Sequence, residues 1–190
     1  MLRRRLGVSP QSAAGPVGRL GAAASDIGGP PPFEPSSATL AATATLAVLC
    51  CLVVGLVVAT PFLAASGGQA ATLLYEAFAP VCHQIAERSF HLAGHPLAVC
   101  HRCFGFYVGF TLGLIVLPLF RPARDWLLEK PRRILLFLTP TAIDWLLPMN
   151  TPASRFVTAV LAAAPIAILV WAAVGQIVQQ MPRNLPPENP

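Results

Sequence analysis

The chain has 190 residues, of which 55% are hydrophobic and 11% are charged. Soluble domains carry about a quarter charged residues, so this composition excludes an ordinary soluble protein and indicates an integral membrane protein. The formal net charge of +5 comes from arginines that stand at the ends of apolar runs rather than among accessible aromatic residues. We therefore interpret the charge as a membrane topology signal and expect no nucleic-acid partner.

Residues 1–38 are rich in Gly, Pro, Ser and Ala, and they open with three consecutive arginines at positions 3–5. Such a segment buries too little apolar surface to offset the entropy lost on ordering, so we expect a disordered cytoplasmic tail. Residues 40–65 contain no charge and exceed the roughly 20 residues that a bilayer core requires. They predict the first transmembrane helix, with Cys50 and Cys51 as packing residues at its centre.

Residues 66–96 form the one extended loop that contains polar residues. Within it, residues 71–85 place apolar side chains near helical spacing, which predicts an amphipathic helix at the membrane interface, interrupted near Pro80. Gly94 and Pro96 then turn the chain back toward the membrane.

Residues 97–120 predict the second transmembrane helix, and its two sides differ. One side carries a glycine at every fourth position, a pattern that lets another helix approach closely and that could support a homo-oligomer. These glycines are Gly105, Gly109 and Gly113. The roughly opposite side carries Cys100, Cys103 and Tyr107.

Residues 121–133 contain five basic and two acidic residues, so the positive-inside rule places this loop in the cytoplasm. Residues 134–149 predict a short third crossing that is broken by Pro140 and contains Asp144. Residues 156–178 predict the fourth crossing, and residues 179–190 a disordered tail. The predicted fold is thus an all-α cell-membrane protein with four transmembrane helices in residues 39–178, both termini cytoplasmic and the Cys/His loop outside.

Asp144 is an ionisable residue inside a predicted membrane segment, where a charge costs about 2.5 to 3.5 kcal/mol on insertion scales. It should therefore have a partner. Arg155 is the nearest candidate in sequence and Arg102 is the second. Such a pair would either fasten two helices together or contribute to a functional site.

The cysteines near the outer end of the second helix have three interpretations. Cys100 and Cys103 would lie on one helical turn, and Cys82 could join them as a third thiolate ligand of a zinc ion, with His83 or His95 completing the set. Alternatively, the Cys100 and Cys103 pair would carry out thiol–disulfide exchange, with Cys82 as a third thiol. The third interpretation is a structural disulfide that leaves one thiol unpaired.

Two stretches, CHQIAERSF at residues 82–90 and VCHRCFGFYVG at residues 99–109, resemble the DUF2085 family of small prokaryotic membrane proteins. The matching residues are Cys82, His83, Gln84, Arg88, Ser89, Phe90, Cys100, Arg102, Cys103, Gly105, Tyr107 and Gly109. Pro140, Asp144 and Arg155 extend the resemblance toward the C-terminus. It implies a membrane protein of unknown activity, and it favours His83 over His91, His95 and His101 as the fourth metal ligand.

The sequence therefore predicts a membrane protein with a metal site formed by Cys82, His83, Cys100 and Cys103. A membrane thiol oxidoreductase that uses a quinone or a soluble thiol partner is the first alternative. A small transporter or assembly factor is the second, with Asp144, Arg102 and Arg155 forming a polar path.

Overall fold

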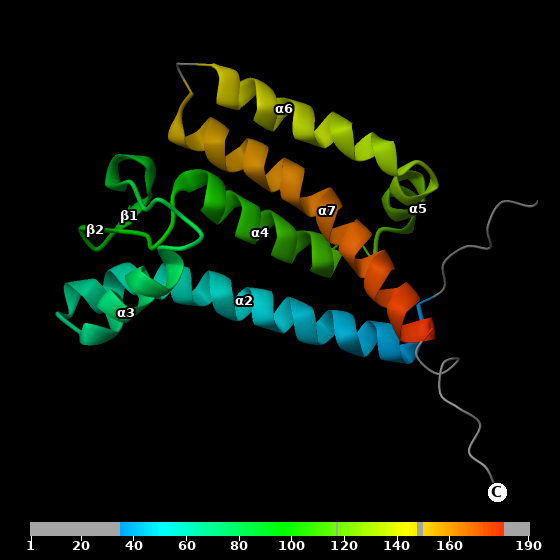
Figure 1. Ribbon diagram of the computed structural model, residues 1–190, viewed down its shortest axis with the longest axis horizontal. Helices are drawn as coiled ribbons and strands as arrows, with labels where there is room; N and C mark the ends of the chain where they lie inside the picture. The colour runs from blue at the N-terminus through cyan, green and yellow to red at the C-terminus, as the bar shows by residue number, and fades with distance from the viewer. Residues whose placement is uncertain (1–34, 117, 148–149, 181–190) are drawn as a thin grey trace, which may run out of the picture. The chain divides into compact units, whose positions relative to one another are not determined.

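The computed structural model describes residues 35–116, 118–147 and 150–180, so most of both predicted tails lies outside the described residues. The four longest elements of the described chain are the helices α2 (Ser37–Ala65), α4 (His101–Val116), α6 (Ile134–Leu146) and α7 (Pro152–Gln180). They run side by side, with α7 in contact with the other three (Figure 1). Hydrophobic packing between these helices therefore forms the body of the described chain.

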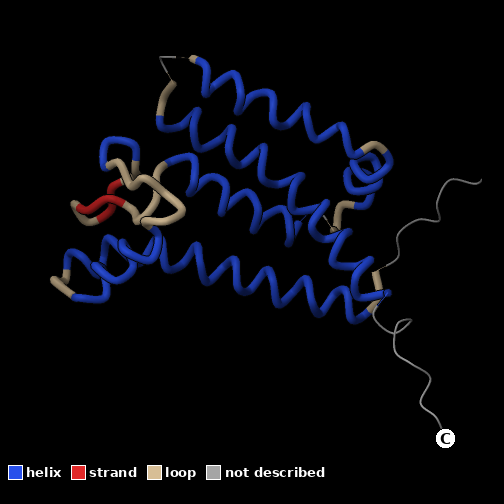
Figure 2. Tube along the Cα trace, in the orientation of Figure 1, coloured by secondary structure: helices blue, strands red, loops and turns tan. Residues whose placement is uncertain are grey.

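The shorter elements gather at the two ends of these helices (Figure 1). One end carries α3 (Gln69–Phe78), the 3-10 turn η1 (Ala86–Arg88) and the hairpin strands β1 (His91–Leu92) and β2 (His95–Pro96). In the described residues, strand is confined to this hairpin (Figure 2). The opposite end carries α5 (Arg121–Glu129), followed by the 3-10 turn η2 (Pro131–Arg133).

Among the described residues, two helices, or three if a bent pair counts as one span, are long and apolar enough to cross a membrane, so the four predicted spans are not shown. Helices α2 and α7 have 29 residues each and are long and apolar enough to cross a bilayer. Helices α4 and α5 meet the same criterion only together, and their axes are bent by 109°. Helix α6 has 13 residues, which span about 20 Å at 1.5 Å per residue, against a hydrocarbon core of about 30 Å.

Several predicted boundaries also need correction. The second helix begins at His101 rather than at residue 97, because residue 97 is still paired with the loop before it: the Leu97 N–H donates to the Phe90 carbonyl at 2.8 Å. Pro140 lies inside α6 and does not break it. The predicted cytoplasmic loop contains a helix, α5, and the amphipathic helix α3 ends at Phe78, before Pro80.

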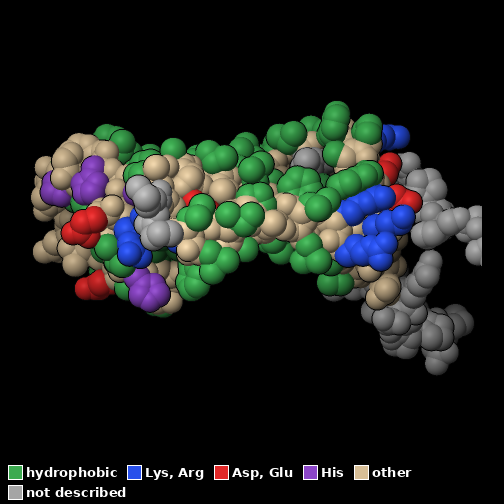
Figure 3. Space-filling model, turned by 90° about the horizontal axis from the view of Figure 1, so that it is seen from above, with side chains coloured by type: hydrophobic (Ala, Val, Ile, Leu, Met, Phe, Trp, Pro, Cys, Tyr) green, Lys and Arg blue, Asp and Glu red, His purple; other side chains and the backbone are tan. Residues whose placement is uncertain are grey.

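Charged and imidazole side chains are segregated along the helices. In the space-filling view, histidines lie at one end and most lysines and arginines at the other, with hydrophobic side chains between them (Figure 3). The basic end is the end of α5 and η2, and the start of α2 and the end of α7 lie at that same end (Figure 1). This distribution is the one that the positive-inside rule associates with a cytoplasmic face.

The glycine stripe of α4 packs against α7 of the same chain. A Cβ atom added to Gly105 would lie 2.5 Å from the Phe156 carbonyl oxygen, and one added to Gly109 would lie 2.5 Å from that of Val160. Gly113 meets the Ala164 carbonyl oxygen in the same way, one turn further on. The chain's own helix thus covers the face that the sequence suggested for a second copy.

Replacing Gly109 with alanine tests this backbone contact. The new methyl group would meet the backbone of Val160, which cannot rotate away, so we expect a loss of about 1 to 3 kcal/mol in the free energy of unfolding. Thermal unfolding of detergent-purified protein measures it. Gly55→Ala is the matched control, because a Cβ there meets nothing within 4 Å. An unchanged melting temperature for Gly109→Ala would contradict the packing.

Candidate metal centre

Three thiols lie together where α3, the hairpin loop and the start of α4 meet. The sulfur atoms of Cys82, Cys100 and Cys103 all lie within 4.8 Å of one another. The side chain of Cys82 is buried, and those of Cys100 and Cys103 are partly exposed. Two thiolates bound to one zinc ion at about 2.3 Å each are at most about 4.6 Å apart, so a small closure would let all three hold the same ion.

The segment carrying Cys82 is fastened to the segment carrying Cys100 by short hydrogen bonds. The Cys100 N–H donates to the Cys82 sulfur at 3.2 Å. The Gln84 side-chain amide donates to the carbonyl oxygens of Tyr75, at 2.6 Å, and Ala98, at 2.9 Å. Gln84 therefore joins the end of α3 to the residues just before Cys100.

A tight hairpin returns the chain from Cys82 to Cys100. Its two turn residues, Ala93 and Gly94, have φ angles of 49° and 81°. Two positive φ angles match the type I′ turn, whose twist suits a two-residue hairpin loop. The Tyr75 hydroxyl then donates to the Pro96 carbonyl at 2.6 Å, which holds the hairpin against α3.

Cys100 occupies the N-terminal cap of α4. Its carbonyl accepts the Phe104 N–H at 2.9 Å, the first helical hydrogen bond. The Cys103 side chain, the N–H groups of Arg102 and Cys103, and the Cys82 side chain all lie close to the Cys100 sulfur and stabilise its negative charge. The contacts with Cys103 lower the pKa of the Cys100 thiol, although its burial acts in the opposite direction, and they favour the thiolate, the form that binds metals.

The histidines differ in their distance from the thiols. His83 is exposed and lines the cavity beside the sulfur atoms, but its imidazole is outside the group whose ligand atoms lie within 4.8 Å of one another. His101 is buried against the Phe90 ring, with centroids 4.3 Å apart. His91 bonds to the Ser89 carbonyl, and His95 lies in the hairpin. The structure therefore brings together three of the four predicted metal ligands.

Tyr107 lies below the thiols in the same small core. This core contains Val57, Cys82, Leu97 and Val99, and the side chains of Cys100, Cys103 and Tyr107 pack against it. The predicted chemical side of the helix is therefore turned toward α2 and the loop, and the glycine side toward α7.

A cavity of about 270 Å³ opens beside the sulfur atoms. It is lined by the three thiols, three arginines, two histidines and two aliphatic residues. These residues are Val81, Cys82, His83, Ile85, Arg88, Cys100, His101, Arg102, Cys103 and Arg155. The candidate centre is thus accessible to a small ligand.

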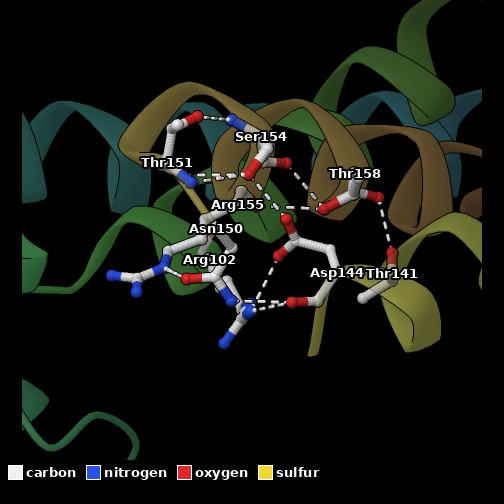
Figure 4. A network of polar contacts seen from close by, with 8 residues as sticks. All are labelled: Arg102, Thr141, Asp144, Asn150, Thr151, Ser154, Arg155 and Thr158. Carbon is white, nitrogen blue, oxygen red and sulfur yellow. Dashed lines mark hydrogen bonds and ion pairs between the residues drawn. The ribbon is translucent and has the colours of Figure 1, made fainter. Parts of the chain in front are cut away.

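Asp144 pairs with Arg102 rather than with Arg155, the partner nearest to it in sequence. The Arg102 guanidinium donates to the Asp144 carboxylate at 2.7 Å, and Asp144 is 5% exposed (Figure 4). The Ser154 hydroxyl donates to the other carboxylate oxygen at 2.5 Å. Helices α4, α6 and α7 thus meet at one buried carboxylate.

Arg155 joins this network through Asn150. Its Nε–H donates to the Asn150 side-chain oxygen at 2.6 Å, and the Asn150 amide donates to the Asp144 carbonyl at 2.6 Å (Figure 4). No role was expected for Asn150, Ser154, Tyr75 or Gln84. Gln84 had one signal, its place in the CHQ motif, whereas the other three gave none.

Comparison with known proteins agrees with the resemblance seen in the sequence. Residues 82–169 match the family described as predicted membrane protein (DUF2085). An uncharacterized protein of Methanocaldococcus jannaschii is 38% identical over 71 residues. That match covers 37% of this chain and 46% of the archaeal protein, so the chain spans about half the length of this curated relative. No solved structure shows significant similarity to the chain.

A double-mutant cycle tests the corrected pairing. Asp144→Leu alone leaves the Arg102 charge without its carboxylate, which costs about 3 to 5 kcal/mol for a fully buried pair and less here, because the Arg102 side chain is 25% exposed. Adding Arg102→Met should recover part of the loss, with a coupling energy above about 1 kcal/mol in thermal unfolding.

The matched control pairs Asp144→Leu with Arg155→Met. Because Arg155 forms no hydrogen bond to the Asp144 carboxylate and is linked to Asp144 by hydrogen bonds through Asn150, its coupling energy should be the smaller of the two. A coupling energy equal to or larger than that of Arg102 would contradict the observed network.

Proposed function

We propose that Cys82, Cys100 and Cys103 bind one metal ion. All three cysteines lie within residues 82–169, which match the DUF2085 family of predicted membrane proteins. The observation that supports this most is the convergence of three sulfur atoms within 4.8 Å in a partly buried site. Thiolates are soft ligands and select zinc, copper(I) or iron. Zinc suits a tetrahedral site of three thiolates and one imidazole.

His83 is the proposed fourth ligand. It adjoins Cys82 in the chain and lines the same cavity as the three sulfurs. The positive φ angle of Gln84, 50°, makes the backbone irregular directly after His83, which helps neighbouring residues to face one ion. A rotation of the exposed His83 side chain would complete the set.

The proposed role of the ion is to brace the loop on α4, at the outer face of the cell membrane. A metal that binds only the folded loop adds its binding free energy to folding. If His83 is displaced by a ligand in the cavity, the ion would offer an open position for that ligand. The basic residues at the opposite end of the helices support the proposed outer location.

Thiol–disulfide exchange is the second candidate. It is supported by the short separation of the Cys100 and Cys103 sulfur atoms, which lie within 4.8 Å of each other. Their oxidation to a disulfide would release two electrons and two protons to a quinone or to a disulfide partner. The transporter or assembly-factor function remains a prediction without a specific observation in its favour.

Elemental analysis of detergent-purified protein tests the metal site. We expect about one zinc per chain, with the three thiols reacting only after chelation, and loss of the metal in Cys100→Ser or Cys103→Ser. Cys51→Ser is the matched control, because Cys51 lies exposed on α2, and it should retain the metal. Metal-free protein with freely reactive thiols would reject the proposal, and a Cys100–Cys103 disulfide would favour the second candidate.

His83→Ala tests the fourth ligand separately. The zinc stoichiometry should persist, because three thiolates remain, but zinc affinity in a competition with a chelator should fall by more than the roughly 10 to 100-fold that losing an outer-shell partner costs. Unchanged affinity would remove His83 from the ligand set. His95→Ala, in the hairpin, is the control and should leave the affinity unchanged.

A further inference from the structure

We propose that the cavity beside the thiols is a binding site for a phosphate group, held by Arg88, Arg102 and Arg155. All three arginines line the cavity, although they come from three separate parts of the chain, η1, α4 and α7. Guanidinium groups present several N–H donors in a planar fork that matches phosphate oxygens. This inference depends on the arginines, not on the metal ion.

The charges around the cavity favour an anion. No Asp or Glu is among its described lining residues, and the nearest carboxylate partner, Asp144, is held by Arg102 and Ser154. A divalent ion with three thiolates would carry one negative charge. The three positive charges of the guanidinium groups outnumber the negative charge of this centre and that of Asp144, so the site remains positive with the metal bound.

Each arginine retains donors that the protein does not use. The Nε atom of Arg102 is buried and has no hydrogen-bond partner among the described residues. Arg155 is oriented through its Nε bond to Asn150, and its terminal nitrogens carry no bond to the residues drawn in Figure 4. Arg88 is exposed and forms no ion pair within the described part of the chain.

Unused buried donors are costly, and a ligand oxygen would satisfy them. A buried N–H without a partner loses its hydration and gains nothing in return. The buried Nδ1 of His101 is also without a partner among the described residues, its ring lines the same cavity, and in the tautomer protonated at Nδ1 it would donate to the same ligand. The two unpartnered atoms, Nε of Arg102 and Nδ1 of His101, thus belong to neighbouring side chains that both line the proposed site.

The size and position of the cavity define the ligand class. The cavity volume of about 270 Å³ is several times the roughly 30 Å³ that one water molecule occupies. The cavity therefore accommodates a phosphate group with a small substituent. Three guanidinium groups offer more donors than the two oxygens of a carboxylate can accept in bidentate pairs, which favours phosphate. Because the cavity lies at an end of the helices, the phosphate could come from a soluble compound or from a lipid headgroup.

Thermal unfolding during titration with inorganic phosphate, at constant ionic strength maintained with sodium chloride, tests the site. We expect a saturable rise in melting temperature for the wild type. Arg88→Gln should weaken the apparent phosphate affinity by about tenfold or more, because a charge-assisted bond is lost and this exposed side chain has no structural partner. Arg132→Gln, on η2 at the opposite end, is the matched control and should bind phosphate as the wild type does.

Two further experiments distinguish a lipid phosphate from a soluble phosphate, and failure of this inference from failure of the metal proposal. The titration is repeated in nanodiscs of phosphatidylcholine with and without phosphatidylglycerol: suppression by phosphatidylglycerol identifies a lipid headgroup, and a persistent shift identifies a soluble phosphate. It is also repeated after chelation, so that metal-free protein that still binds phosphate supports this inference even where the metal proposal fails. No saturable shift in any arm, or an equal shift in Arg88→Gln, would overturn it.

Discussion

The close approach of α4 to α7 is the constraint on which the site depends. Gly105, Gly109 and Gly113 let the two backbones meet without intervening side chains. At that separation Arg102, at the start of α4, reaches Asp144 on α6, and Ser154 on α7 donates to the same carboxylate. The apolar packing along the helices and the polar network at their end are therefore parts of one arrangement.

The loop between α2 and α4 then brings the thiols to this end of the helices. Gln84 and Tyr75 tie α3 and the hairpin to the residues before Cys100, so Cys82 meets a pair of cysteines that the first turn of α4 already presents. A metal ion would replace weak thiol contacts with bonds that connect the loop to the helix. The neighbouring arginines give the same location a positive field, which suits an anion beside the centre.

Much of this arrangement could be predicted from the sequence, because local patterns encode it. The uncharged stretch at residues 40–65 correctly indicated a helix long and apolar enough to cross a bilayer, and the CHQ and CHRC motifs correctly indicated a thiol cluster. Partners distant in sequence could not be predicted. Asp144 lies 42 residues from Arg102 and only 11 from Arg155, so proximity favoured the wrong arginine. Likewise, a glycine stripe shows that a helix approaches, but not which helix, and apolar composition did not reveal that α6 is too short for a straight span.

The central claim is that the three thiols share one metal ion. X-ray absorption spectroscopy at the zinc edge of purified protein tests it most directly. The account predicts three sulfur neighbours at about 2.3 Å and one nitrogen neighbour at about 2.0 to 2.1 Å, with one sulfur fewer in Cys82→Ser. A spectrum of nitrogen and oxygen neighbours only, or protein without bound metal, would contradict the account.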